Sequence, residues 1–257
     1  MSPTTTSTST SSFPPAADTT YARSLLAHPP SSDPAAIRRA ISALSLQAHI
    51  EGGFFAETDR DALLIPNPFQ NLPLLANATS QKDTSATRSA STTIFYLVSP
   101  TSPVGYFHRN RGRTVHTLHR GRGRYVLLHV DRRDEQGRVP VESFVVGQDI
   151  ERGERLQWIV DGGKFKASFL LPDDKNSHTA AEGLSNGGEG TGVSEKGLLI
   201  SETVVPGFEY SDHDFLTAEG MVEYLDPKEI EELKWLLKRA EQDRLDEVLK
   251  TKQQQQK

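Results

Sequence analysis

The segment from Gly105 to Arg124 concentrates side chains that can do chemistry, since it contains three histidines and six arginines. A neutral imidazole can accept a proton or ligate a metal, and a guanidinium group matches the geometry of carboxylates and phosphates. The histidines are His108, His116 and His119. The segment therefore predicts a pocket wall, and it leaves open a metal site, a proton-transfer site and an anion site. Hydrogen-bonded structural histidines are the alternative interpretation.

The arginines bracket one predicted strand, at positions 109, 111, 113, 120, 122 and 124. One or two of them turned inward would select an anionic ligand, because the guanidinium fork binds carboxylate or phosphate oxygens in pairs. Arg109 is the candidate that we select. A solvated basic edge, which keeps a sheet from pairing with its neighbours, is the alternative. Nucleic-acid binding is not expected, because the patch lacks interleaved aromatic residues that stack on bases.

Carboxylates and aromatic residues elsewhere in the chain could complete such a pocket. Glu51 and Glu57 flank a Gly-Gly pair, and either could pair with an arginine or act as a base. His108 together with Glu57 or Asp212 would form a general-base pair. Several aromatic residues could form the base of a pocket and stack on a sugar or a nucleobase, or could be ordinary core residues: Tyr96, Tyr125, Trp158, Phe165 and Phe208.

Composition limits the class of protein. Only 35% of the 257 residues are hydrophobic, which favours one domain of about 150 residues with appendages. The absence of cysteine excludes disulfides, thiolate metal sites and a cysteine nucleophile. No apolar run is long enough to span a membrane, and the net charge is −5. We therefore expect a cytoplasmic protein with neither a membrane nor a nucleic acid as partner.

Eight short strand patterns in succession predict an all-β sandwich or small barrel. They cover residues 91–98, 104–109, 114–119, 124–130, 141–146, 155–160, 165–171 and 198–205. The Gly-Gly pair before the first of them is typical of a turn or bulge that leads into a further strand. Because side chains alternate along a strand, His116 and His119 are expected on opposite faces of theirs.

The remaining segments divide the chain into one domain with appendages. Residues 1–32 are rich in Ser, Thr and Pro and predict a disordered tail, and residues 251–257 predict a second tail. The domain spans residues 33–225, opens with a short helix, and carries insertions near residues 66–88 and 173–196. A C-terminal helix is predicted over residues 226–250, because Asp226 and Glu229 form a capping box at its start.

Six separated pieces of the chain, in order between Ile37 and Tyr224, resemble the cupin superfamily, in particular its uncharacterised cupin-5, or domain-of-unknown-function, branch. HIEGGFFAET at 49–58 is similar to that branch's opening HPEGGYFRET. The other pieces are STTIFYLV at 91–98, FHR at 107–109, the glycine at 121, QWIVDGG at 157–163 and VVPGFEYSDHDF at 204–215. The resemblance implies the RmlC-like jelly roll, a double-stranded β-helix, with a short helix at each end. It also implies a homodimer.

Many cupins hold a metal through a His-x-His pair, a glutamate and a later histidine, because imidazoles and a carboxylate suit transition metals. The resemblance places Tyr106 and His108 at the two positions of the His-x-His pair. It places Thr114 at the position of the glutamate and Lys166 at the position of the later histidine. A lysine that is protonated near neutral pH has no lone pair to donate. We therefore expect no bound metal and no other cofactor.

The residues and the resemblance together predict the members of the site. We predict His108 and Glu57, which aligns with the RET carboxylate of the family, as catalytic residues. The predicted substrate-binding residues are Glu51, Arg109, His116, Tyr125, Lys166 and Phe208. His116 is included because the family comparison places it inside the barrel.

The same resemblance predicts what the site would do. Because the superfamily contains sugar-nucleotide epimerases, we expect a small anionic ligand of the sugar, nucleotide or carboxylate type. Any reaction would be of the metal-independent isomerase or epimerase type. Two alternatives stay open. One is a metal-dependent dioxygenase or hydrolase that uses His108 with His116 or His119. The other is a non-catalytic binding or scaffold protein.

Overall fold

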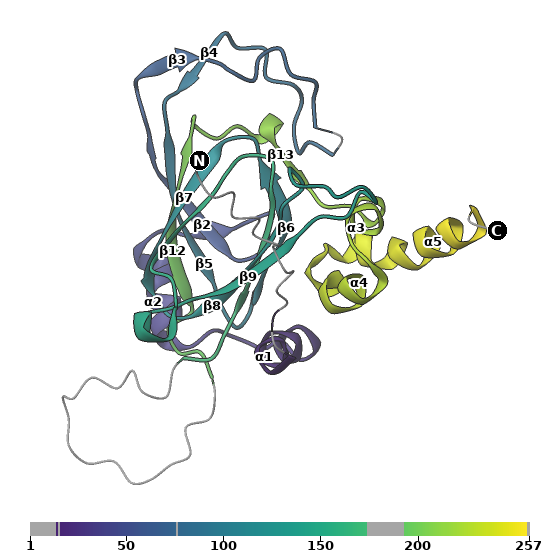
Figure 1. Ribbon diagram of the computed structural model, residues 1–257. Helices are drawn as coiled ribbons and strands as arrows, with labels where there is room; N and C mark the ends of the chain where they lie inside the picture. The colour runs from purple at the N-terminus through teal and green to yellow at the C-terminus, as the bar shows by residue number, and fades with distance from the viewer. Residues whose placement is uncertain (1–13, 15, 76, 174–192, 256–257) are drawn as a thin grey trace, which may run out of the picture.

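The computed structural model describes residue 14 and residues 16–75, 77–173 and 193–255. Two β-sheets face each other and form a jelly-roll barrel (Figure 1). The six-stranded sheet has the order β1 (Gln47–Ala48), β2 (Phe54–Arg60), β5 (Thr92–Val98), β12 (Leu198–Val205), β7 (Arg113–Arg120) and β10 (Gln157–Val160). The five-stranded sheet has the order β13 (His213–Phe215), β6 (Val104–Asn110), β11 (Phe165–Leu170), β8 (Gly123–Leu128) and β9 (Val141–Val146).

All eight predicted strands are present, with ends that differ from the prediction by two residues or fewer. The alternation of side chains along a strand is visible in the burial of β7, where His116 and Leu118 are buried and His119 is exposed. The expectation that His116 and His119 face opposite sides is therefore confirmed. The Gly-Gly pair also forms the predicted turn, since Gly52 and Gly53 both have positive φ angles directly before β2.

The space between the sheets is apolar at one end and polar at the other. The apolar end contains side chains from both sheets, which pack into one cluster: Tyr96, Val98, Leu118, Tyr125, Leu127, Phe144, Val146, Trp158, Val160, Leu170, Leu198 and Ile200. Each fully buried aliphatic or aromatic side chain of this kind contributes about 1.5–3 kcal/mol to folding. The polar end contains buried histidines, glutamates and a lysine, which are described below.

Helices cover the outer faces of both sheets (Figure 1). Helix α2 (Ala35–Ala43) packs on the six-stranded sheet through Ile37, which lies in one cluster with Leu97 and Leu199. Helix α3 (Ala218–Tyr224) and the segments that follow it pack on the outer side of the five-stranded sheet, through a cluster that includes Phe107 and Phe169. Burial on both sides explains why β8 and β11 have no exposed residue.

The single helix predicted over residues 226–250 is wrong, because the chain turns in its middle. Helix α4 (Pro227–Leu233) begins with the predicted capping box, continues as the 3₁₀ turn η3 (Lys234–Leu236), and is followed by the separate helix α5 (Arg239–Gln255). Trp235, Leu236 and Leu237 are all buried. Three consecutive side chains cannot all lie on one face of a helix, so their burial requires the break.

The disordered tail predicted over residues 1–32 also needs correction. Its first 13 residues lie outside the described part of the chain, but Ala16–Ala27 form helix α1. Ala22 belongs to the core, and Arg124 of β8 forms an ion pair with Asp18. The Ser/Thr/Pro-rich composition of the whole segment hides the short apolar spacing of Tyr21, Ala22 and Leu25, which is what packs α1 on the domain.

The two predicted insertions have different outcomes. The segment near residues 66–88 is mostly loop, and its ends pair as the two-stranded sheet of β3 (Leu64–Pro66) and β4 (Thr87–Ser89). Most of the insertion near 173–196 lies outside the described residues. Within the described part of the chain, no helix has the length and apolarity that a membrane span requires.

Candidate functional site

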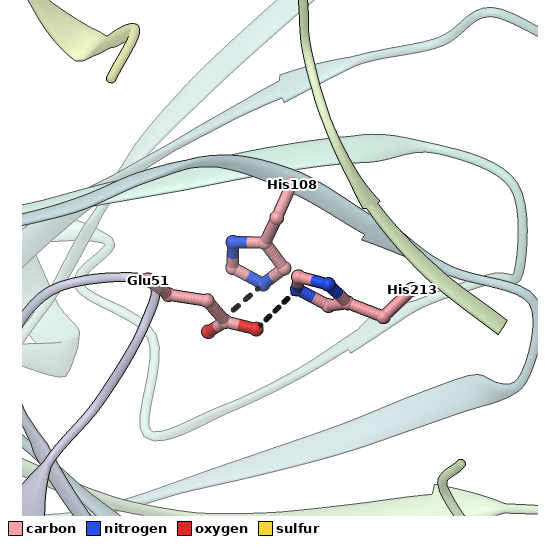
Figure 2. A group of neighbouring side chains, drawn as sticks. All are labelled: Glu51, His108 and His213. Carbon is pink, nitrogen blue, oxygen red and sulfur yellow. Dashed lines mark hydrogen bonds and ion pairs between the residues drawn. The ribbon is translucent and has the colours of Figure 1, made fainter. Parts of the chain in front are cut away.

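Three buried side chains from distant parts of the sequence meet at the polar end of the barrel (Figure 2). Glu51 lies in the Gly-Gly turn before β2, His108 lies on β6, and His213 is the first residue of β13. Because β13 pairs with β6 in antiparallel register, the rings of His108 and His213 lie side by side, with their centroids 5.4 Å apart. The turn then points the Glu51 carboxylate toward both rings (Figure 2).

The Glu51 carboxylate is surrounded by imidazole nitrogens. Its Oε1 lies 2.8 Å from Nε2 of His213, and its Oε2 lies 3.3 Å from Nε2 of His108. A third imidazole, that of His49, places Nδ1 3.4 Å from Oε2. The backbone carbonyl of Glu51 accepts a hydrogen bond from the amide of Tyr106, which ties the turn to β6. The sequence around the Gly-Gly pair therefore both forms the turn and fixes the carboxylate.

The protonation states in this cluster follow from burial and from its neighbours. Burial lowers the pKa of His108 to about 3, although the Glu51 carboxylate opposes this shift. Burial alone would raise the pKa of Glu51, but His108, His49 and His213 outweigh it and hold that pKa well below its usual range. At neutral pH the cluster thus contains an ionised carboxylate beside a neutral His108.

A second polar cluster lies next to the first, and Lys166 is its centre. The Lys166 ammonium nitrogen lies 2.6 Å from Oε2 of Glu202 and 2.9 Å from Nε2 of His116. The register of β12 on β7 places Glu202 directly opposite His116, and the ring of His116 stacks on Trp158. An ammonium group can only donate hydrogen bonds, so Nε2 of His116 accepts one and the ring is neutral. Lys166 is therefore the cation of this cluster.

A cavity of about 90 Å³ opens beside the two clusters. Its lining includes Glu51, Glu202 and His49, and it extends past Arg60 at the rim. Four apolar side chains complete the walls: Phe55, Ile94, Val204 and Phe208. The arrangement can hold a small molecule next to carboxylates and an imidazole, which are the groups that transfer protons or bind metals.

The sequence and the fold can be compared with known proteins at this point. The family model described as Cupin superfamily (DUF985) matches residues 38–216, which is more than half of the chain. The chain belongs to this cupin family. The match covers the whole barrel, from α2 to β13, and therefore contains Glu51, His108 and His213.

Relatives of this cupin agree with the assignment. An uncharacterized protein of Saccharomyces cerevisiae, YML079W, is 39% identical over 206 residues, which cover 79% of this chain and 87% of that protein. A hypothetical protein from Leishmania major is similar in structure, with a TM-score of 0.55, 28% identity and coverage of 77% and 96% of the two chains. Protein SO0799 from Shewanella oneidensis shares the fold, with a TM-score of 0.53, 20% identity and coverage of 80% and 99%.

The structure separates the residues predicted for the cupin site into two groups. Glu51, His108, His116 and Lys166 lie in the two buried clusters, and Phe208 lines the cavity. Two others lie elsewhere. Tyr125 is buried in the apolar end, with its ring centroid 4.6 Å from that of Trp158, and Arg109 forms a paired ion contact with Asp214 across β6 and β13.

The carboxylate partner of His108 differs from the two expected ones. Glu57 lies at the cavity rim, about two-fifths exposed, and pairs with Arg60. Asp212 pairs with Arg88 at 2.6 Å, and Arg111 lies near its other oxygen. The contact to His108 comes from Glu51, which the prediction had placed among the substrate-binding residues.

The arginines do not form the wall of the cavity. Five of the six predicted ones pair with carboxylates outside its lining: Arg109 with Asp214, Arg111 with Asp212, Arg113 with Asp161, Arg122 with Glu154 and Arg124 with Asp18. The one arginine in the lining is Arg60, which is paired with Glu57 and Glu209. Paired guanidinium groups are already satisfied, so they offer little to an anionic ligand.

Three residues of the site were missed by reasoning from the sequence: His49, Glu202 and His213. Glu202 carried a usable signal, because it is the one charged residue of the strand pattern LLISETVV and is expensive to bury without a partner. His49 and His213 lie within two of the motifs that carry the family resemblance, HIEGGFFAET and VVPGFEYSDHDF. The motifs were used there to recognise the family, and neither histidine was considered as a member of the site. Their spacing along the chain gives no local pattern.

Proposed function

We propose that this cupin binds a small hydroxylated molecule of the sugar type in the barrel cavity. The observation that carries the proposal is the composition of the lining, which sets the aromatic rings of Phe55 and Phe208 beside the carboxylates of Glu51 and Glu202. Carboxylate oxygens accept hydrogen bonds from hydroxyl groups, and aromatic faces pack on the apolar face of a sugar ring. The lining therefore complements a neutral polyol.

Charge favours this ligand over the other two expected types. Four glutamates line the cavity, and its one arginine is already paired. An anion placed there would be repelled by carboxylates without gaining a free guanidinium partner.

A ligand panel tests the proposal. Neutral monosaccharides should raise the thermal midpoint of the protein in a concentration-dependent way, and isothermal titration calorimetry should then give a dissociation constant for the best of them. We expect Phe208→Ala to weaken that affinity by about tenfold or more, which corresponds to about 1.4 kcal/mol, because it removes an aromatic wall of the cavity.

The matched control is Phe69→Ala, because Phe69 packs against Arg88 and is not in the cavity lining. This variant should bind the sugar as the wild type does. Sugar phosphates or nucleoside diphosphates that bind better than neutral sugars would contradict the proposed ligand class. Equal losses in both phenylalanine variants would contradict the proposed location.

A proton-transfer reaction of the isomerase or epimerase type is the second candidate function. It is favoured by the imidazole–carboxylate contact of His49 with Glu51, since both groups line the cavity. A positioned pair of this kind typically accelerates proton transfer by about 10²–10⁴-fold. Incubation of the bound sugar with protein in D₂O should replace a carbon-bound hydrogen by deuterium, as followed by proton NMR. His49→Gln should abolish the exchange; exchange at an unchanged rate would remove this pair from the reaction.

A further inference from the structure

We propose that Glu51, His108 and His213 form a binding site for one divalent first-row transition-metal ion, with Zn²⁺ and Co²⁺ as the ions to test. One oxygen and two imidazole nitrogens, all within 4.8 Å of one another, come from the turn before β2 and from strands β6 and β13. These are not the positions at which the family resemblance placed a metal. Of that set, only His108 is shared.

The orientation of His108 is the first observation that points to a cation. Its Nδ1 lies 2.8 Å from the backbone carbonyl of Tyr106, and since a carbonyl only accepts, Nδ1 carries the hydrogen. The neutral ring then directs the lone pair of Nε2 toward Oε2 of Glu51, 3.3 Å away. This buried Nε2 makes no hydrogen bond. Two acceptors that face each other in a buried site are stabilised by a cation between them.

The surroundings of His213 resemble those of a metal-bound histidine. Metal-ligating histidines usually donate the hydrogen of the second ring nitrogen to a nearby oxygen, which fixes the tautomer. In His213, Nδ1 lies 3.3 Å from Oγ1 of Thr79, and that hydroxyl donates its own hydrogen to the carbonyl of Tyr210. Oγ1 can therefore accept from Nδ1. Nε2 of His213, which lies 2.8 Å from Oε1 of Glu51 in this structure, would then offer its lone pair to a metal bound between the two residues. In His108 the Tyr106 carbonyl has the same role.

The charge balance of the barrel interior is a third and independent observation. Lys166 is paired with Glu202, so those two charges cancel. Glu51 is buried, yet among the described residues no lysine or arginine nitrogen lies within 4.0 Å of its carboxylate. Its partners within that distance are imidazoles, and a divalent ion would add a fixed positive charge beside this buried carboxylate.

The geometry is close to what a small metal ion needs. Bonds of about 2.0–2.2 Å place neighbouring ligand atoms about 3–3.5 Å apart, and since the atoms of this cluster lie within 4.8 Å of one another, the widest pair must close by at most about 1.3–1.8 Å. Two histidines and one carboxylate leave further coordination positions for water or an oxygen ligand. Because Glu51 also lines the cavity, the metal would lie beside it. Metal binding is measurable without any sugar, so it can succeed or fail independently of the proposed ligand.

The test uses the full chain, free of any polyhistidine tag, after removal of metals with a chelator. Reloading with Zn²⁺ or Co²⁺ and desalting should leave one metal per chain by elemental analysis, with a raised thermal midpoint. The Co²⁺ form should also show visible d–d absorption from a mixed nitrogen and oxygen ligand set. Glu51→Gln and His213→Gln should each weaken Co²⁺ binding by more than about 100-fold, because each removes a direct ligand.

His129→Gln is the matched control, because His129 forms a similar contact with a carboxylate, that of Glu142 at 3.0 Å, outside the cluster. It should bind one metal as the wild type does. Circular dichroism confirms that each variant is folded, and His213→Gln decides the question if Glu51→Gln does not fold. Wild-type protein that retains no stoichiometric metal would overturn the proposal. So would folded Glu51 and His213 variants that bind Co²⁺ as tightly as the control.

Discussion

Replacing Lys166 by methionine should lower the free energy of unfolding by about 3–5 kcal/mol, because it leaves the buried Glu202 carboxylate without its cation. Lys166 and Glu202 are less than a tenth exposed, and water cannot compensate the loss. The double variant Lys166→Met/Glu202→Leu should be more stable than Lys166→Met, since it removes both charges together and fills the space with apolar groups. Urea unfolding followed by tryptophan fluorescence gives the three free energies.

The control for this prediction lies two residues away. Lys164 pairs with Asp131 at 2.5 Å, but Asp131 is about half exposed, so water can solvate its carboxylate when the lysine is removed. Lys164→Met should therefore cost about 1 kcal/mol or less. Equal effects of the two lysine substitutions would show that burial of the Lys166–Glu202 pair does not matter.

The pH dependence gives a second check on the same pair. Burial opposes ionisation of Glu202, but Lys166 outweighs it and lowers the pKa of Glu202 below its usual value. A carboxyl with a lowered pKa in the folded state contributes its full stability above the unfolded pKa of about 4.3 and loses it as the pH falls further. The stability difference between wild type and Glu202→Gln should therefore be constant near neutral pH and shrink below about pH 4.

Gly52→Ala should destabilise the protein by about 3 kcal/mol or more and displace Glu51. Gly52 has a φ of +96°, and an alanine Cβ at this position would overlap the backbone carbonyl oxygen of Val104. A side chain in such a backbone region costs about 1–3 kcal/mol by strain alone, and the overlap with backbone adds to it. Urea unfolding measures the loss. Co²⁺ binding by the folded fraction should fall as well, because the turn positions the carboxylate.

Gly137→Ala separates strain from overlap. Gly137 has a similar φ of +82°, but a Cβ there would meet no atom within 4 Å. The free energy of unfolding of this variant should fall only by the cost of the left-handed conformation, about 1–2 kcal/mol, and the variant should bind Co²⁺ normally. A Gly52 variant that is no less stable than the Gly137 variant would mean that the turn before β2 can move away from β6 without cost.

Local patterns in the sequence predict the fold well, because they depend on neighbouring residues only. Short strand patterns punctuated by Gly, Pro and Asp located all eight strands from β5 to β12, and the Asp226–Glu229 capping box marked the start of α4. The alternation of side chains along a strand placed His116 and His119 on opposite faces of β7, and the family resemblance placed His116 on the inner one. The prediction failed where packing between distant elements decides, as in the break between α4 and α5 and in helix α1, which docks on the barrel.

The site shows the same division between local pattern and tertiary contact. The sequence by itself determined that His108 and Lys166 stand on barrel strands, and that a lysine would act as a cation and not as a ligand. Only the tertiary structure decided which carboxylate each one meets. Glu51, His108 and His213 lie on a turn and two strands brought together by cross-strand pairing and by a turn far away in the chain. Alternation determines the face on which a side chain lies, but strand order and register determine its neighbours.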